Sequence, residues 1–330
     1  MPAGVSLLES LGVSLAPERC HPFHGIRYID ALTGPVQQIA EGDFPTGSGL
    51  GIRRTELQSA LLTRAEALGA TLCWGEEIEG ISQAGLCTST REIPVDWIVG
   101  ADGLHSPVRK WSGIETTPGT HTRFGIRQHF QQTPWSAHVE VYWGPGVEAY
   151  VTPVSAQEVG IALLWNGSKA RFPDLLAKVP ALQERVAQAR SCSQPRGAGP
   201  LHQKVEQVWK DRTLLIGDAS GYLDAITGEG MAMSFRQAQA LATCLKAGRP
   251  QDYPRAHRAI CRPYYRLTHL VLWAGRHPEL MRRAIRGLSR DPGLFSRVLG
   301  LVEGQKSIGQ LGWTSLLRFV VGLAFRTGKP

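Results

Sequence analysis

The stretch that decides the fold is residues 213–242, TLLIGDASGYLDAITGEGMAMSFRQAQALA. Its first four residues form a short apolar run that ends at Gly217, a pattern typical of a buried strand in a parallel sheet. Asp218 therefore stands at the carboxyl end of this predicted strand, which is the edge where open α/β sheets bind ligands. A carboxylate in that place can accept hydrogen bonds from the hydroxyl groups of a ligand.

A predicted loop and helix follow the strand. Gly228 and Gly230 allow the backbone to approach a ligand closely, and Met231 begins a segment rich in Ala and Gln that predicts a helix. The free N–H groups at such a helix start favour a negatively charged ligand. A strand, turn and helix that bind nothing have the same spacing, so the local pattern alone leaves both interpretations open.

The whole stretch closely resembles the second FAD-binding motif of the FAD-dependent monooxygenase superfamily, the para-hydroxybenzoate-hydroxylase-like fold. The resemblance is to the branch that contains geranylgeranyl reductases and flavin-dependent halogenases, where Gly-Asp-Ala is followed by an aromatic-containing turn, Asp-Pro, Thr-Gly-Glu-Gly and a helix of small residues. Ala225 departs from this pattern because the family usually has a proline there, which predicts a loosened loop. The resemblance implies FAD contacts for Gly217, Asp218, Gly228, Glu229, Gly230 and Met231.

A second motif lies at residues 100–109, GADGLHSPVR, after another predicted buried strand. It resembles the superfamily hallmark Gly-Ala-Asp-Gly-x-x-Ser-x-Val-Arg, whose acid lies by the FAD pyrophosphate, and this implies the same place for Asp102. Ser106 is predicted to cap a helix opened by Pro107. The structural alternative is a capped helix in which Arg109 pairs with Asp102.

Two arginines open a third predicted element. Residues 54–67 predict a helix with one apolar stripe, closed by Gly69, and Arg53 and Arg54 stand at its start. In the resembled family, the arginine that opens an Arg-x-x-Leu-x-x-x-Leu helix lies beside the cofactor. The resemblance therefore implies cofactor contacts for both arginines, with simple solvation as the alternative.

Residues 123–165 contain several β-rich runs broken by glycine and proline, which predict an antiparallel sheet inserted between the two motifs. In the family this sheet forms one wall of the substrate pocket. Candidate pocket residues are Trp143, Tyr150 and Trp165, against the alternative that these aromatic side chains belong to the core. Further strands are predicted within residues 21–38, 49–53 and 71–81, and a helix over residues 175–189.

The family's first βαβ unit has no counterpart in this sequence. That unit carries GxGxxG for the pyrophosphate and an acid for the adenosine ribose, whereas this sequence begins with a predicted amphipathic helix over residues 4–12. The run GSGLG at residues 47–51 has the wrong spacing and flanks. A truncated, non-catalytic flavoprotein fragment is therefore one hypothesis for the protein.

Positive charge is concentrated in the last part of the sequence. Residues 246–330 hold 16 Lys or Arg and 4 Asp or Glu, so they carry +12 and residues 1–245 carry −4 of the net +8. Arg255, Arg258, Arg262 and Arg266 are spaced for one face of a helix, with Leu267 and Leu270 on the other. We expect these helices, continuing to Phe325, to cover the substrate pocket. Peripheral contact with an anionic membrane is the alternative, and no nucleic-acid partner is expected.

The composition excludes several classes of protein. A chain of 330 residues with 42% hydrophobic and 19% charged residues is expected to fold, and its length suggests about two domains. The six cysteines form no CxxC pair, which argues against a metal site or disulfides and favours a cytoplasmic location. No signal peptide or membrane span is predicted, and the lone His105 is interpreted as solvated rather than catalytic.

The predicted fold is α/β, with a Rossmann-like FAD/NAD(P)-binding domain that is incomplete at its N-terminus. Residues 1–20, 50–112 and 205–250 are assigned to that domain, residues 21–49 and 113–204 to an inserted antiparallel β-sheet substrate domain, and residues 251–330 to C-terminal helices. The leading hypothesis is an NAD(P)H-dependent FAD monooxygenase that uses O₂ to hydroxylate a small organic or natural-product substrate, with no catalytic residue assigned. The alternative is a geranylgeranyl-reductase-like enzyme that saturates isoprenoid double bonds.

Overall fold

The computed structural model describes residues 1–32, 38–119 and 122–302. The helices are α1 (Pro2–Ser10), α2 (Arg54–Ala67), α3 (Pro107–Trp111), α4 (Phe172–Leu176), α5 (Pro180–Arg185), α6 (Gly230–Lys246), α7 (Tyr253–Gly275), α8 (Pro278–Arg290) and α9 (Pro292–Val302), with short 3-10 turns η1 (Pro17–Arg19), η2 (Gly217–Ser220) and η3 (Pro250–Asp252). The strands are β1 (Cys20–Phe23), β2 (Gly25–Asp30), β3 (Ile39–Asp43), β4 (Gly49–Ile52), β5 (Ile78–Ile81), β6 (Gly85–Thr88), β7 (Glu92–Pro94), β8 (Ile98–Gly100), β9 (Thr116–Pro118), β10 (Arg123–Gln131), β11 (His138–Gly144), β12 (Val147–Ser155), β13 (Glu158–Asn166), β14 (Arg190–Ser191), β15 (Arg196–Ala198), β16 (Gln203–Val205), β17 (Trp209–Lys210) and β18 (Thr213–Leu215).

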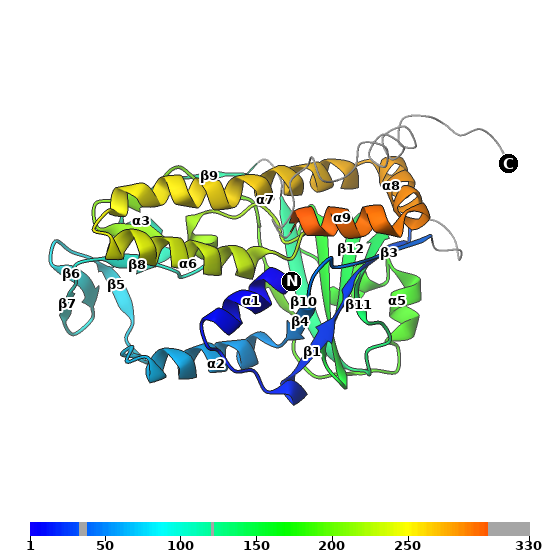
Figure 1. Ribbon diagram of the computed structural model, residues 1–330, viewed down its shortest axis with the longest axis horizontal. Coiled ribbons are helices and arrows are strands. Elements are labelled where there is room, and N and C mark those ends of the chain that lie inside the picture. Colours follow the sequence, from blue (N-terminus) through cyan, green and yellow to red (C-terminus); the bar gives the residue numbers. More distant parts are fainter. Residues whose placement is uncertain (33–37, 120–121, 303–330) are drawn as a thin grey trace.

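A large sheet forms one half of the molecule (Figure 1). Its strands run in the order β14-β10-β13-β12-β11-β2-β3, and β15 also pairs with β10. The pairs β10–β13, β12–β13 and β11–β12 are antiparallel, as predicted for residues 123–165. The pair β11–β2 is parallel. A long stretch of sequence separates these two strands, so they are not the two arms of a hairpin, which would have to be antiparallel.

The two faces of this sheet are buried against different helices. Alternate residues of β13, such as Ile161 and Leu163, pack with α4 and α5 in one apolar cluster. Val141 and Trp143 of β11 face the other way, into a cluster with residues of α7, α8 and α9. This period-two alternation is what a sheet covered on both sides requires.

The other half holds the segments that carry the two predicted cofactor motifs. The strand β18 pairs with β8 in parallel and with β17 in antiparallel orientation. Leu214 and Leu215 of β18 are fully buried against Leu241 of α6 and Tyr253 of α7. The helices α6 and α7 lie side by side (Figure 1). The α/β fold class is thereby confirmed, whereas the domain boundaries stay predictions.

Several predicted elements differ from the structure. Residues 71–77 are not a strand, and only β5 of the predicted run 71–81 forms one. The predicted helix over residues 175–189 is two short helices, because Pro180 starts a new one. Of the early strands, β2 joins the large sheet, but β1 pairs with β4 in a separate ribbon.

The C-terminal helices α7, α8 and α9 are present, and the predicted continuation from residue 303 to Phe325 lies outside the described residues. Leu270, predicted to lie on the apolar face of α7 opposite the arginines, is 59% exposed. The buried face instead carries Tyr253, His257, Cys261, Thr268 and Leu272. Within the described residues, none of the helices combines the length and the apolar character that a membrane crossing needs.

Candidate cofactor site

The two predicted cofactor motifs meet at one edge of the small sheet. In the parallel pair of β18 and β8, Leu215 lies opposite Gly100, so the residues after both strands emerge side by side. Gly217 and Gly103 have φ values of +60° and +85°, which side chains with a Cβ rarely adopt. The sheet edge thus presents two tight turns, one before Asp218 and one after Asp102.

Asp218 lies partly buried in the turn η2. Burial raises the pKa of its carboxyl, and the positive charge of Arg54 partly lowers it. Arg54 at the start of α2 therefore lies close enough to act on this carboxylate. Arg53 has a different partner: its Nε donates to Glu158 Oε1 of β13 at 2.5 Å. Arg54 thus acts on Asp218, whereas Arg53 is held by Glu158.

The second motif has the predicted local structure with one correction. Ser106 Oγ accepts a hydrogen bond from the Arg109 N–H at 3.0 Å and caps α3. Asp102 Oδ2 accepts from the Val108 N–H at 3.0 Å. Arg109 does not pair with Asp102 through a hydrogen bond. Its guanidinium donates to the carbonyl oxygens of Ala219 at 2.8 Å and Leu104 at 3.0 Å, so it joins the two motifs.

The start of α6 has features that fit a bound cofactor. Gly228 has φ +68°, and a Cβ added there would meet no atom within 4 Å, so its backbone faces open space. Glu229 is 3% exposed, its Oε1 has no hydrogen-bond partner, and burial raises the pKa of its carboxyl. Met231 is 37% exposed. An open glycine beside an unsatisfied buried carboxyl oxygen matches a place where a polar ligand completes the structure.

A ring of hydrogen bonds behind Gly217 was not predicted. The Gly217 N–H donates to Gln237 Oε1 at 2.6 Å, and Ser220 Oγ donates to the Gly217 carbonyl oxygen at 2.7 Å. Gln237 Nε2 donates to Cys261 Sγ at 3.2 Å, and His257 closes the ring with Nε2 2.9 Å from Ser220 Oγ and Nδ1 3.9 Å from Cys261 Sγ. Burial lowers the pKa of His257 to about 4. The neutral imidazole therefore fastens the turn η2 to α7.

A buried ion cluster was also not predicted. Arg123 of β10 donates to Glu148 of β12 at 2.9 and 3.0 Å and to Asp224 at 2.8 Å. Burial alone would lower the pKa of Arg123, but the two carboxylates raise it above its ordinary value. Asp224 belongs to the loop between η2 and α6, and its Oδ1 accepts from the Ile226 N–H. The cluster thus fastens this loop to the large sheet.

The three candidate substrate-pocket residues do not share one surface. Trp143 and Tyr150 lie on the face covered by α7 to α9, and the Tyr150 hydroxyl donates to the Ile226 carbonyl oxygen at 3.1 Å. Trp165 lies on the opposite face. Its ring stacks on Phe124 at 5.7 Å between centroids.

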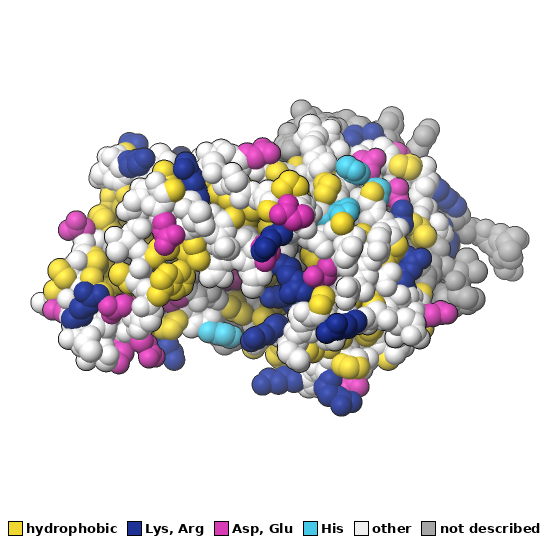
Figure 2. Space-filling view, turned by 90° about the horizontal axis from the view of Figure 1, so that it is seen from below, with side chains coloured by type: hydrophobic (Ala, Val, Ile, Leu, Met, Phe, Trp, Pro, Cys, Tyr) yellow, Lys and Arg dark blue, Asp and Glu magenta, His cyan; other side chains and the backbone are white. Residues whose placement is uncertain are grey.

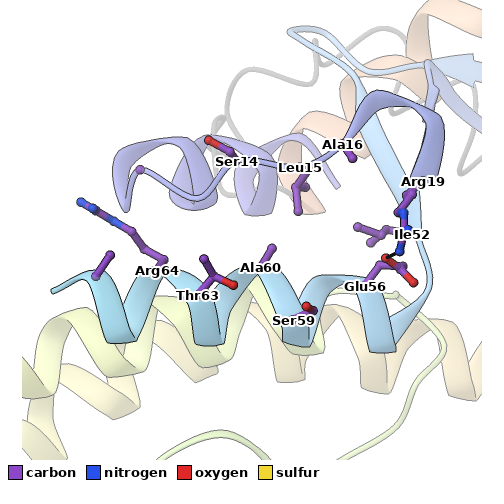
Figure 3. Close-up of a pocket in the computed structure, with 12 residues that line it drawn as sticks. Ser14, Leu15, Ala16, Arg19, Ile52, Glu56, Ser59, Ala60, Thr63 and Arg64 are labelled. Carbon is purple, nitrogen blue, oxygen red and sulfur yellow. Dashed lines mark hydrogen bonds and ion pairs between the residues drawn. The ribbon is translucent and has the colours of Figure 1, made fainter. Parts of the chain in front are cut away.

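Two hollows lie near these elements. One of about 280 Å³ is bounded by the end of the large sheet and the junction of α7 and α8, and Trp143, Glu148 and Arg282 are among its lining residues. The other, of about 370 Å³, lies between residues 12–19 and α2 (Figure 3). The Arg19–Glu56 ion pair borders the second hollow, and none of the predicted cofactor residues lines it.

Comparisons with known proteins identify the family of this chain. A family model described as an FAD binding domain matches residues 37–249. The FAD-dependent monooxygenase fmqB of Aspergillus fumigatus is 24% identical over 301 residues, with 78% of this chain and 71% of that protein covered. A digeranylgeranylglycerophospholipid reductase of Methanothrix thermoacetophila is 27% identical over 148 residues, which are 42% of this chain and 38% of the reductase.

The fold also has a solved relative. The flavin-dependent brominase Bmp2 superposes with a TM-score of 0.78 at 14% identity, with 97% of this chain and 87% of the brominase covered. At this identity the likeness concerns the fold alone. The family match covers both motifs and the sheet between them. The chain therefore belongs to the FAD-binding domain family of the FAD-dependent monooxygenase superfamily.

Proposed function

We propose that this protein is an FAD-dependent monooxygenase that hydroxylates a small organic substrate with O₂ and takes its reducing equivalents from NAD(P)H. The observation that carries the proposal is that the strands before Asp102 and Asp218 end side by side and that α6 packs against the turn that holds Asp218, within the region matched by the FAD-binding model. Bound FAD supplies the redox chemistry, and the protein supplies placement and electrostatics.

The chain's own residues have distinct roles in this proposal. Asp218 accepts hydrogen bonds from cofactor hydroxyl groups, a role that suits its partly buried place at a strand end. The free N–H groups at the start of α6 favour negative charge on the reduced cofactor. Gly228 gives the close backbone approach, and Glu229 Oε1 offers an unused acceptor. Asp102 and Arg54 border the same region and contact the polar part of the cofactor.

The substrate wall is proposed on the face of the large sheet that carries Trp143 and Tyr150. Tyr150 contacts the loop that precedes α6, which supports a place near the cofactor. Trp143 borders the hollow of about 280 Å³, slightly below the size of most drug-sized ligand pockets. We do not propose Trp165 as a pocket residue, because it packs on the other face.

The C-terminal helices are proposed as a cover for this wall. Residues of α7, α8 and α9 pack directly on the face of the sheet that carries Trp143. This packing supports a covering role for the helices in preference to contact with a membrane. All six cysteines are free thiols, which supports the proposed cytoplasmic location.

Oxygen labelling tests the proposed reaction. With the FAD-loaded protein, NAD(P)H and a panel of small aromatic and isoprenoid compounds, we expect one atom of ¹⁸O from ¹⁸O₂ in a product and no turnover without oxygen. The second candidate is a reductase of isoprenoid double bonds, favoured by the similarity to the archaeal reductase. If the protein saturates a double bond without oxygen, and incorporates no label when oxygen is present, it is this reductase and not a monooxygenase.

A further inference from the structure

Two polar side chains that the proposed reaction does not use are buried behind the turn η2. Gln237 of α6 is 1% exposed and His257 of α7 is 8% exposed. Gln237 Oε1 accepts a hydrogen bond from the Gly217 N–H at 2.6 Å, and His257 Nε2 lies 2.9 Å from Ser220 Oγ. Burial of a polar side chain is costly unless its hydrogen bonds are made. The turn therefore supplies the partners that keep both side chains in the core.

The peptide groups of Gly217 fix the direction of these hydrogen bonds. Its N–H can only donate, so Gln237 presents its oxygen to Gly217 and its NH₂ group to Cys261 Sγ, at 3.2 Å. The carbonyl oxygen of Gly217 can only accept, so the Ser220 hydroxyl proton points to it, at 2.7 Å. Ser220 Oγ is then left to accept from His257. The proton of the imidazole therefore lies on Nε2.

The surroundings of His257 favour the neutral imidazole. Burial lowers the pKa of His257 to about 4, and the positive charge of Arg258 lowers it further. Burial also raises the pKa of the Cys261 thiol to about 11, so this neighbour stays uncharged at neutral pH. Neither the Ser220 hydroxyl nor the Cys261 thiol supplies a negative charge that would favour the imidazolium. His257 therefore acts as an uncharged donor.

The polar groups on either side of Asp218 are held in place. Gly217 has φ +60° and both of its peptide groups are bound, while the Ala219 carbonyl oxygen accepts from Arg109 at 2.8 Å. The Asp218 carboxylate, in contrast, forms no hydrogen bond or ion pair within the residues that the structure describes. A rigid turn thus carries one partly buried carboxylate whose acceptor sites are unused.

The charge near Asp218 favours its ionised form. Arg54, at the start of α2, lowers the pKa that burial raises. Lys and Arg side chains also gather near the middle of the face seen from below (Figure 2), the side on which α2 lies in Figure 1. An ionised carboxylate can only accept hydrogen bonds, so its ligand must offer donors such as hydroxyl groups.

We propose that Gln237 and His257 are positioning residues, which hold Asp218 in place for the hydroxyl groups of FAD, and that His257 acts as its Nε2–H tautomer. The two side chains act through the Gly217 backbone and the Ser220 hydroxyl, and they touch neither cofactor nor substrate. This inference rests on the proposed function, because FAD is the ligand of Asp218 there. The alternative is that Gln237 and His257 only stabilise the fold.

A double-mutant cycle tests whether Gln237 acts through Asp218. FAD is titrated into the apoproteins of the wild type, Q237M, D218A and D218A/Q237M. Methionine resembles glutamine in length but leaves the Gly217 N–H without its acceptor. We expect Q237M to bind FAD about tenfold more weakly than the wild type, and to cause no further loss in D218A. An equal loss in both backgrounds, or no loss in Q237M, overturns the proposal.

The donor role of His257 is tested by rescue. H257Q keeps an N–H group near the position of Nε2, whereas H257L has none. We expect H257L to bind FAD about tenfold more weakly and H257Q to recover most of the affinity. The stability control is L182A, which opens a cavity at a fully buried residue of α5. It should lower the Tm and leave FAD affinity unchanged. Equal losses in H257Q and H257L overturn the donor role.

Nuclear magnetic resonance of protein labelled with ¹⁵N in its histidines shows the tautomer directly. At pH 7 we expect a neutral imidazole with its proton on Nε2, and the signal should be missing in H257L. A proton on Nδ1, or a charged ring, overturns the assignment. A wild type that binds FAD but incorporates no oxygen would refute the proposed reaction and leave the positioning role intact. A wild type that binds no FAD would overturn the positioning role.

Discussion

Replacing Arg123 by methionine lowers the free energy of unfolding by about 3–5 kcal/mol, as expected when one member of a buried ion cluster is removed. The Arg123 side chain is 6% exposed and holds the carboxylates of Glu148 and Asp224, which are 10% and 1% exposed. Without the guanidinium, two carboxylates stay buried beside each other. Burial already raises the pKa of Glu148 in the intact cluster, so the folded state would take up protons or open the loop.

Urea unfolding followed by circular dichroism measures this loss. The conservative variant R123K should lose less stability, because it keeps the charge but cannot bridge both carboxylates with a planar fork. The matched control is R171M: Arg171 also makes two hydrogen bonds to one carboxylate, but it is 83% exposed, and little change is expected. A loss for R123M as small as that for R171M would show that the cluster does not hold the loop to the sheet.

Replacing Asp218 by alanine weakens FAD binding by about 10- to 100-fold, the range that the loss of a charged hydrogen bond predicts. The carboxylate stands at the end of β18, and the ring through Gln237, Ser220 and His257 fixes the backbone of the preceding glycine. Alanine at this position leaves the ring in place and removes only the acceptor. Quenching of flavin fluorescence on titration of the apoprotein gives the dissociation constant.

The control for this variant is D174A, which removes an exposed carboxylate of α4. Its FAD affinity and its Tm should match those of the wild type. The Tm of D218A should also stay close to the wild-type value. Burial disfavours the ionised carboxylate of Asp218 in the folded protein and raises its pKa, so removing this carboxylate costs little stability. Unchanged FAD affinity in D218A would show that Asp218 does not contact FAD.

The parts of the fold that were predictable from the sequence depend on local patterns. The helix α2 begins at Arg54 and ends at Ala67 as predicted, because its apolar stripe and the closing Gly69, with φ +86°, are both local signals. The strand β18, the turn η2 and the helix α6 follow from an apolar run, two glycines and a segment of good helix formers. The four long strands of residues 123–166 followed from alternation and turn residues.

The parts that were not predictable depend on pairing between distant segments. Arg123, Glu148 and Asp224 form one cluster only because β10 and β12 flank β13 in a register that puts Arg123 and Glu148 on the same face of the sheet, where the loop before α6 contacts them. A charged residue inside a predicted strand does not show which distant residue will pair with it. The side of the sheet that Trp165 faces depends on register parity, which sequence alone does not give.

The exposure of Leu270 has a different cause. Apolar periodicity predicts the buried face of a helix when its partner is an apolar core. The buried face of α7 carries the polar residues His257, Cys261 and Thr268 as well as Leu272, and Leu270 does not lie on that face. In the sequence, a buried helix face made of hydrogen-bonding residues therefore has the same polar pattern as a solvent-exposed face.

The visible absorption spectrum of this purified 330-residue chain, recorded after incubation with FAD and gel filtration, tests directly whether the chain binds FAD. We expect a flavin absorption band that elutes with the protein and is lost in D218A, because the residues at the sheet edge hold the cofactor. A colourless protein that nevertheless shows a cooperative unfolding transition would rule out this site, since the fold would then be intact without binding FAD.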